Sequence, residues 1–180
     1  MPIEHDRLFV KPVFTQEEIK KRVTELGARI SEDYRKKNLL LLGILKGAYP
    51  FFADLSRAIS LPLQVDFLMV SGHRIVSEIT QNIADQDVLI IEDIVDSGET
   101  SATLKKELQA YHPRSLRLCA LLDKPHRRKV TVSIDYTGFP SPNKYVVGYG
   151  LDYKNKYRNL PYIAVLDQIT EEEERRLYAV

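Results

Sequence analysis

Val88-Leu89-Ile90-Ile91-Glu92-Asp93-Ile94-Val95-Asp96-Ser97-Gly98-Glu99-Thr100 carries the strongest structural signal in the chain. The first four residues are apolar, which is typical of a strand buried on both faces. An acidic doublet follows, and then a third carboxylate and a Ser-Gly-x-Thr turn that leads toward a helix. In open α/β sheets, ligands bind outside the carboxyl ends of the strands. The stretch therefore predicts a binding site at the edge of a parallel sheet.

Strands and helical segments alternate along the chain around this stretch. Leu39 to Leu45 is a short apolar run, and Ala48 to Ile59 carries apolar residues at helical spacing. The other predicted strands are Leu63 to Val70, Val88 to Ile91, Leu116 to Leu122 and Val130 to Ile134, and a further helix is predicted from Thr100 to Tyr111. This alternation predicts an α/β fold in which a parallel sheet of about five strands is flanked by helices.

Two regions fall outside this alternation. Residues 71–86 join two predicted strands through a polar stretch without periodicity, and a loop of that length is a candidate lid. From Tyr136 onward the chain is rich in turn formers and tyrosines. We expect a single domain over residues 1–180, with a core of roughly 30–135 and a small hood built from the N-terminal residues and roughly 136–170.

The composition limits the classes of partner. The 180 residues include 26 Lys+Arg and 25 Asp+Glu, and a net charge of +1 gives no general basis for binding nucleic acid or a membrane surface. The longest apolar run, Leu39 to Leu45, is far shorter than the roughly 20 residues that span a bilayer. Met1 to Asp6 does not resemble a secretory signal. Cys119 is the only cysteine, so we expect no internal disulfide, a buried inert thiol and a cytoplasmic location.

The turn after the strand has the chemistry of an anion site. Ser97 and Gly98 permit a tight turn whose N–H groups point inward, and Ser97 and Thr100 add hydroxyl donors. The preceding carboxylates can hold sugar hydroxyls, bind Mg²⁺ indirectly or take a proton. A ligand with both a phosphate and a polyol is therefore expected. The alternative is that Asp96 or Ser97 merely caps the helix, which leaves the two charges that end a buried strand unexplained.

The run Ile90 to Thr100 closely resembles the phosphoribosyl pyrophosphate motif of type I phosphoribosyltransferases. Its Glu-Asp doublet resembles most the hypoxanthine-guanine phosphoribosyltransferases. Leu45 to Leu55 is similar to the pyrophosphate loop and following helix of that family, and Lys144 to Leu160 resembles its purine-binding stretch. The resemblance covers roughly residues 30 to 165 and implies the type I fold.

The resemblance also implies roles for the residues of the motif. Glu92 and Asp93 would hold the ribose hydroxyls, and the loop of Asp96, Ser97, Gly98, Glu99 and Thr100 would wrap the 5′-phosphate. Asp96 would also be catalytic, approaching the purine N7 as a general base or proton holder. Mg²⁺ is the implied cofactor, with Glu92, Asp93 and the Asp152 carboxylate as its candidate ligands.

Further roles follow for the other two segments. Backbone groups of Lys46 and Gly47 would contact pyrophosphate, and the guanidinium of Arg158 would reach it. Lys46 has the alternative of an ordinary exposed lysine. The residues implied for purine binding are Lys124, Tyr145, Val146 and Asp152.

Lys124 sets the expected class of base. A lysine donates hydrogen bonds and cannot accept them, so it favours a 6-oxo group over the 6-amino group of adenine. Two plainer interpretations stay open: Lys124 could lie in a solvated basic turn with Arg127, Arg128 and Lys129, and Tyr145 could be a core aromatic.

The candidate lid departs from the family pattern. Relatives carry a Ser-Tyr pair at this point, whereas here Ser71 is followed by Gly72 and His73, and no tyrosine occurs from 71 to 86. The loop is also shorter, which puts closure and turnover in doubt. His73 could partly replace the aromatic, or could simply be exposed. The run Glu171 to Arg176 is expected to be a solvated helical end.

The implied reaction moves the phosphoribosyl group from phosphoribosyl pyrophosphate to hypoxanthine, and to guanine. Two alternatives remain: a xanthine-preferring transferase, and an RNA-binding regulator of the pyrimidine-attenuation type on the same fold. The near-neutral charge and the Glu92-Asp93 doublet count against RNA. The family implies a homodimer or homotetramer, with no membrane partner and no nucleic acid.

Overall fold

Six strands form the main sheet of the computed structural model, which describes residues 9–72 and 74–166. In spatial order they are β4 (Arg74–Ile75), β3 (Gln64–Ser71), β2 (Leu39–Leu45), β5 (Asp87–Val95), β6 (Ser115–Asp123) and β7 (Tyr136–Pro140). All neighbouring pairs are parallel except β3 and β4. The predicted parallel sheet is therefore confirmed, with β5 near its centre and one short antiparallel strand at its edge.

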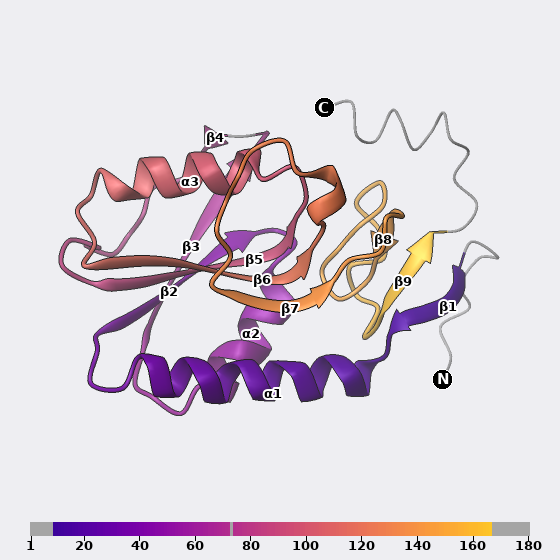
Figure 1. The fold of residues 1–180 in the computed structure, drawn as a ribbon, viewed down its shortest axis with the longest axis horizontal. Coiled ribbons are helices and arrows are strands. Elements are labelled where there is room, and N and C mark those ends of the chain that lie inside the picture. The colour runs from indigo at the N-terminus through magenta and orange to yellow at the C-terminus, as the bar shows by residue number, and fades with distance from the viewer. Residues whose placement is uncertain (1–8, 73, 167–180) are drawn as a thin grey trace.

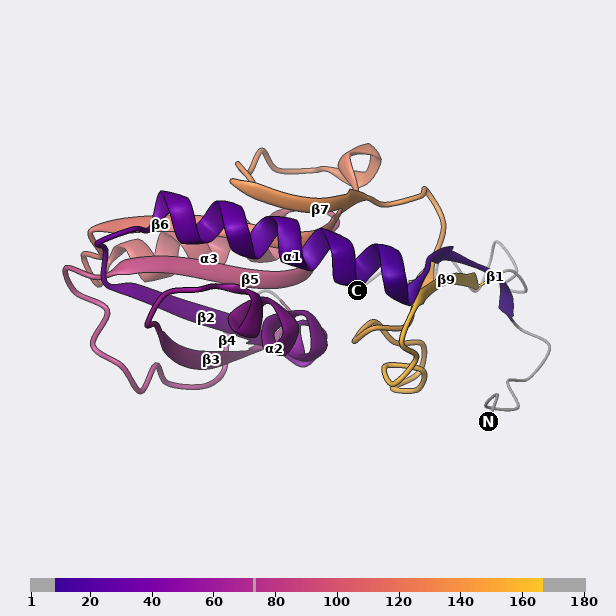
Figure 2. The ribbon, with the colours of Figure 1, turned by 90° about the horizontal axis from the view of Figure 1, so that it is seen from below.

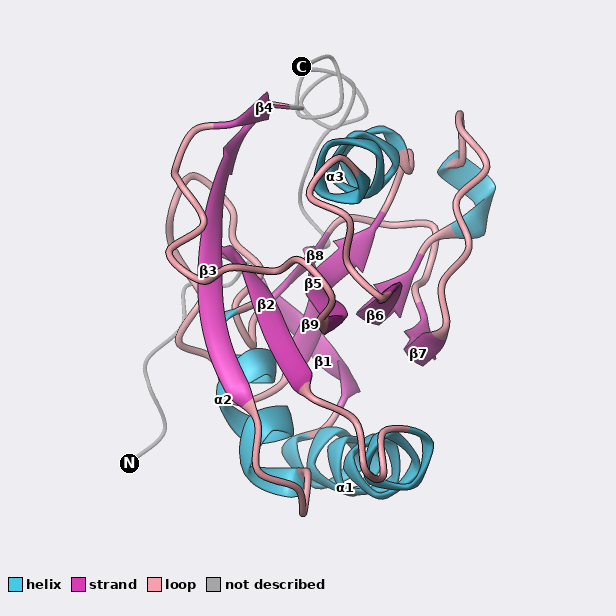
Figure 3. Cartoon of the chain, turned by 90° about the vertical axis from the view of Figure 1, so that its left-hand side faces the viewer, coloured by secondary structure: helices cyan, strands magenta, loops and turns pink. Residues whose placement is uncertain are grey.

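Helices cover both faces of this sheet, as predicted (Figure 3). Helices α1 (Gln16–Asp33) and α2 (Tyr49–Ala58) lie on one face, and α3 (Glu99–Gln109) lies on the other. The core splits accordingly into two clusters, because alternate residues of a strand point to opposite faces. Leu39, Leu41, Leu89 and Ile91 pack with α1 and α2, whereas Leu40, Leu42, Val88 and Ile90 pack with α3.

Helix α1 was not predicted, although the sequence contains a start signal for it. The Thr15 side chain accepts a hydrogen bond from the Glu18 backbone, and the Glu18 side chain accepts one from the Thr15 backbone. This reciprocal capping box satisfies N–H groups that the first turn leaves without partners. The apolar stripe that follows is Ile19, Val23, Leu26 and Ile30, all buried.

A second, three-stranded sheet lies beside the main one (Figures 1 and 2). Its order is β1 (Phe9–Phe14), β9 (Ile163–Leu166) and β8 (Val146–Val147), all antiparallel. The hydroxyl of Tyr149 in the following loop donates to Asp54 Oδ2 at 2.7 Å, which joins this sheet to α2. We call this sheet with the 141–162 loops the hood.

The structure corrects two boundaries of the predicted organisation. Val130 to Ile134 is not a strand; its partly buried Val132 and Ile134 pack against the cluster beneath α3, which produces the alternating pattern without a strand partner. The edge of β6 is taken instead by β7. Residues 136–140, assigned to the hood from the sequence, therefore lie in the main sheet.

The candidate lid begins with a tight return. Ser71 pairs with Arg74 across the turn between β3 and β4, and the chain then comes back along the sheet. Asp66 holds this returning segment, because its Oδ2 accepts hydrogen bonds from the backbone N–H groups of Thr80 and Gln81 and from the Thr80 hydroxyl. This role of Asp66 was not predicted from the sequence.

The expected inert thiol is confirmed: Cys119 is fully buried in β6, and burial raises its pKa above the usual value. The hypotheses on His73 and on Glu171 to Arg176 fall outside the described residues. Among the described residues, no helix is long and apolar enough to cross a membrane.

Candidate active site

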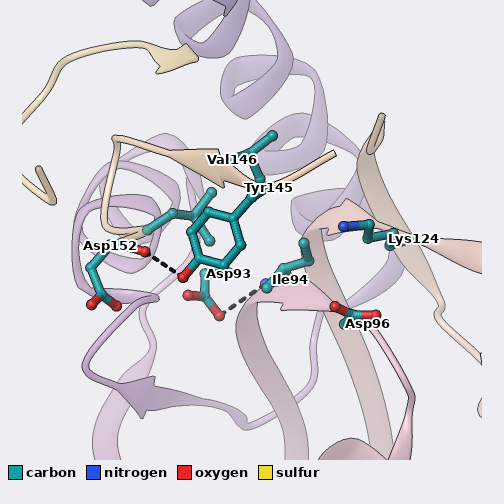
Figure 4. A pocket seen from close by; sticks show the side chains of 8 residues that line it. Asp93, Ile94, Asp96, Lys124, Tyr145, Val146 and Asp152 are labelled. Atoms are coloured by element: carbon teal, nitrogen blue, oxygen red, sulfur yellow. Dashed lines mark hydrogen bonds between the residues drawn. The ribbon is translucent and has the colours of Figure 1, made fainter. Parts of the chain in front are cut away.

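A cavity of about 280 Å³ opens at the carboxyl ends of β5 and β6, under the hood (Figure 4). Its lining comprises Asp93, Ile94, Asp96, Lys124, Tyr145, Val146, Leu151 and Asp152. All four residues predicted to bind a purine are in this set, together with two of the three predicted carboxylates of β5 and its following loop. Two further lining residues, Ile94 and Leu151, were not predicted from the sequence; they are apolar neighbours of the predicted residues Asp93 and Asp152.

Asp93 lies between the sheet and the pyrophosphate-loop candidate. Its Oδ1 accepts a hydrogen bond from the Ile94 backbone at 2.9 Å. A Cβ atom added to Gly47 would overlap Asp93 Oδ2, so only glycine permits the backbone to approach this carboxylate so closely. Burial raises the pKa of Asp93 to about 6, against the opposing effects of the Ile94 N–H and of Arg158.

Glu92 points away from the cavity. It is 5% exposed, faces α3 and does not line the cavity, because its side chain alternates with that of Asp93 on β5. Burial and then the charge of Asp93 raise its pKa well above the usual value, and a hydrogen bond with Ser101 opposes this. The role of Glu92 toward ribose or metal therefore stays a prediction.

The N-cap residue of α3, Gly98, makes no side-chain cap. Gly98 occupies the N-cap position with φ of 84°, a left-handed conformation that favours glycine. Asp96 therefore does not cap the helix, and the capping alternative is wrong for it. Ser97 Oγ accepts a hydrogen bond from the Glu99 backbone at 3.3 Å. N–H groups at the start of a helix, next to Ser97 and Thr100, are suited to an anion.

A basic turn, residues 124–129, packs against this loop. It contains the short helix η1 (Pro125–Arg127), and the backbone N–H of Lys129 donates to the Ser97 carbonyl at 2.9 Å. Arg127 and Arg128 form ion pairs with Asp96 and Asp123. Arg128 Nη1 is buried with no hydrogen-bond partner in the described residues, which is consistent with an anion nearby.

Lys124 is not a solvated member of that turn. Its side chain is 2% exposed, lines the cavity, and donates from Nζ to the Lys144 carbonyl at 2.9 Å. The interpretation as a solvated basic turn is therefore wrong for this residue. A buried ammonium in a cavity wall is costly unless hydrogen bonds satisfy it.

Tyr145 and Asp152 close the cavity from the hood side (Figure 4). The Tyr145 hydroxyl donates to the Asp152 carbonyl at 2.8 Å, and burial raises the pKa of Tyr145 to about 12. The ring is partly exposed to the cavity, so it is not simply a core aromatic. Arg158 forms an ion pair with the Asp152 carboxylate at 2.5 Å and donates to the Gly150 carbonyl.

Lys46 directly precedes Gly47, the residue that packs against Asp93. The Leu45–Lys46 peptide bond is cis, and the Lys46 side chain is exposed. Gly150 of the hood packs directly on Gly47, since a Cβ on Gly150 would overlap the Gly47 carbonyl. Residues from two of the predicted segments, together with Lys124, line the cavity, and the third segment touches it only through the contact of Gly47 with Asp93.

Comparisons with known proteins agree with this geometry. A family model described as a phosphoribosyl transferase domain matches residues 10–154. The hypoxanthine-guanine phosphoribosyltransferase of Mycobacterium avium is 46% identical over 171 residues, covering 86% of this chain and 84% of that protein. The hypoxanthine phosphoribosyltransferase of Salmonella typhimurium is 40% identical over 166 residues, covering 86% and 93%. A solved hypoxanthine phosphoribosyltransferase of Staphylococcus aureus has a TM-score of 0.89 at 40% identity, covering 93% and 98%.

The family match spans both the main sheet and the loop that bears Asp96, so the chain belongs to the phosphoribosyltransferase family. Within it, the chain belongs to the hypoxanthine-guanine phosphoribosyltransferase group, because the similarity to such relatives extends along most of both chains.

Proposed function

We propose that the enzyme transfers the 5-phosphoribosyl group of phosphoribosyl pyrophosphate to hypoxanthine, and to guanine, releasing pyrophosphate and forming the nucleoside 5′-monophosphate. One observation carries the proposal. A single cavity gathers a carboxylate, Asp96, a buried ammonium, Lys124, and an aromatic ring, Tyr145, close to the start of α3.

In the proposed reaction, purine N9 forms a bond to the anomeric carbon while the bond from that carbon to pyrophosphate breaks. The proton on purine N7 passes to the Asp96 carboxylate, which keeps the new nucleotide neutral at the base. Lys124 donates to the 6-oxo group, and the Tyr145 ring packs against the purine face. Backbone groups of Val146 and Asp152 are assigned to the opposite edge of the base.

The phosphate end of the substrate is assigned to the loop from Asp96 to Thr100. The N–H groups at the start of α3 and the hydroxyls of Ser97 and Thr100 would bind the 5′-phosphate. The backbone of Lys46 and Gly47 and the Arg158 guanidinium would bind the pyrophosphate. For this, Arg158 exchanges its present partner, Asp152, for the leaving group.

The carboxylates are compatible with Mg²⁺. No group of three or more metal-ligating side chains is present in the described residues. Proteins usually hold Mg²⁺ with one or two carboxylates together with substrate phosphates and waters. Asp93 and Asp152 line the cavity and would hold it, and the bound ion would neutralise charge on the departing pyrophosphate.

The main alternative outside enzymology is RNA binding, for which the basic turn, residues 124–129, would be a local patch of positive charge. Within the described structure, Arg127, Arg128 and Lys129 each form an ion pair with a carboxylate, so the turn offers little free charge to a phosphate backbone. Xanthine as a preferred base is distinguished by the assay below.

A coupled spectrophotometric assay tests the proposal, with phosphoribosyl pyrophosphate, Mg²⁺ and, separately, hypoxanthine, guanine, xanthine, adenine or uracil. We expect product from hypoxanthine and guanine, and at least about a 100-fold lower rate in Asp96→Asn, because general base catalysis contributes about that much or more. Product from xanthine alone would move the assignment to that base. No product with any base, in protein that still binds phosphoribosyl pyrophosphate, would overturn it.

The assembly and location are proposals from the resemblance. We propose that the single domain forms a homodimer or homotetramer in the cytoplasm. Light scattering of the purified chain at micromolar concentration distinguishes these assemblies from a monomer.

A further inference from the structure

Arg127 contacts the proposed proton acceptor from outside the cavity. Its Nε donates to Asp96 Oδ1 at 3.1 Å, and Arg127 itself is not part of the cavity lining. Within the described residues, Asp96 Oδ2 has no hydrogen bond. One oxygen of the carboxylate is therefore held by the basic turn, while the second is left for a ligand.

The backbone fixes Arg127 relative to Asp96. The N–H of Lys124 donates to the Val95 carbonyl at 3.0 Å, and the N–H of Arg127 donates to the Lys124 carbonyl at 3.2 Å. On the other side of η1, the N–H of Lys129 donates to the Ser97 carbonyl at 2.9 Å. The residues before and after Asp96 are thus both bound to the turn that carries Arg127.

The same turn carries Lys124 into the cavity wall. Two groups that the proposed reaction places on the same base, Lys124 and Asp96, are therefore held in register by one short segment. Reacting groups lose much of their effect when they are misplaced by about 1 Å. The contact is also partly open to water, since the two side chains are 32% and 29% exposed, so it contributes little to folding.

We propose that Arg127 is a positioning residue, which orients the Asp96 carboxylate so that Oδ2 meets the purine N7 proton. The inference rests on the proposed function, in which Asp96 accepts that proton. Arg127 needs no contact with either substrate for this role, and it acts only through Asp96.

Single-turnover rates with hypoxanthine and phosphoribosyl pyrophosphate test the role, because product release often limits the steady-state rate. We expect Arg127→Ala to slow the single-turnover step by about 10-fold or more, with the KM for phosphoribosyl pyrophosphate changed by less than about 2-fold. Arg127→Lys, which keeps a charged donor, should recover part of the rate. Arg35→Ala is the control: it removes an exposed arginine that pairs with Glu32, outside the cavity and the basic turn, and should stay close to wild type.

The double variant Arg127→Ala with Asp96→Asn gives the decisive comparison. If Arg127 acts through Asp96, the double variant is no slower than Asp96→Asn alone. A further loss in the double variant would show an independent role and overturn the proposal, as would an Arg127→Ala that is unchanged, faster, or altered only in KM. Arg127→Gln repeats the test should the alanine variant not fold. An Asp96→Asn of full activity would instead overturn the proton-acceptor role itself, whatever Arg127 does.

Discussion

Glu92 and Asp93 are adjacent on β5, yet they meet different surroundings. The alternation of side chains sends Asp93 to the cavity and Glu92 to the α3 side. Burial raises the pKa of both carboxyls. Although the sequence suggests one shared function for Glu92 and Asp93, only Asp93 lines the cavity, and Glu92 is a buried carboxyl on the other face of the sheet.

The stability of Glu92→Gln relative to the wild type should increase as the pH rises. The pKa of Glu92 is above its usual 4.5 in the folded chain, so its stabilising effect is complete below that pH and is lost as the pH rises toward the folded value. The amide cannot ionise and avoids this loss. We expect the difference in Tm, variant minus wild type, to become more positive from about pH 4.5 to pH 8. Thermal unfolding across that range measures it.

The exposed Glu107→Gln on α3 controls for the removal of one negative charge. A Tm difference for Glu92→Gln that does not vary with pH would show that the buried carboxyl does not change its protonation on unfolding.

The segment after β4 depends on one carboxylate. Asp66 is 7% exposed and accepts hydrogen bonds from Phe67, Thr80 and Gln81. Burial acts to raise its pKa, but the hydrogen bonds outweigh burial and hold the pKa below the usual value. The candidate lid is therefore anchored on β3 at its returning end.

Asp66→Asn should weaken the attachment of the segment after β4 to β3. An amide NH₂ can only donate a hydrogen bond, so it cannot replace a carboxylate oxygen that accepts from backbone N–H groups. We expect a loss of about 1–3 kcal/mol at pH 7, as for a buried group deprived of partners. A carboxyl with a lowered pKa stabilises above the unfolded value and loses this effect as the pH falls through the folded value. Urea unfolding at pH 7 and at pH 3 should therefore show a difference from wild type that shrinks in acid. A difference that grows in acid would contradict the anchoring role.

At the scale of the whole molecule, the candidate active site lies between the main sheet and the hood. The contacts that join them include the hydrogen bond from the Tyr149 hydroxyl to Asp54 and the packing of Gly150 against the carbonyl of Gly47. Burial, followed by the hydrogen bond to Asp54, raises the pKa of Tyr149. The hood is thus in direct contact with the loop assigned to pyrophosphate, through Gly150 and Gly47.

Tyr149→Phe should weaken the attachment of the hood to α2, because it removes the hydrogen bond to Asp54 and keeps the ring. Loss of one hydrogen bond is expected to cost about 0.5–1.5 kcal/mol in urea unfolding. We expect the KM for phosphoribosyl pyrophosphate to rise by up to about 10-fold, which corresponds to about 1.4 kcal/mol, while the KM for hypoxanthine changes less. Tyr111→Phe, at an exposed tyrosine beyond the end of α3, is the control. An equal rise in both KM values would indicate a general disturbance of the cavity.

The fold was largely predictable where burial is continuous. Leu39 to Leu45 has the predicted bounds, because a strand buried on both faces is a plain apolar run. Helix α1 was missed although its capping box is legible, and Val130 to Ile134 was misassigned because a segment lying across a helix can alternate like a strand. An alternation of apolar and polar residues indicates which side chains are buried. Whether the segment is a strand depends on its backbone hydrogen-bond partners.

The sequence alone was sufficient for the α/β class, the motif from Glu92 to Thr100 and the family, because these depend on residues close together in the chain. Tertiary structure alone decided that Glu92 turns from the cavity, that Lys124 is buried and that Arg127 holds Asp96. These features depend on contacts between residues that are distant in the sequence; Arg127 and Asp96, for example, are 31 positions apart. Such contacts depend on how β5, β6 and the basic turn pack, and no local pattern encodes that packing.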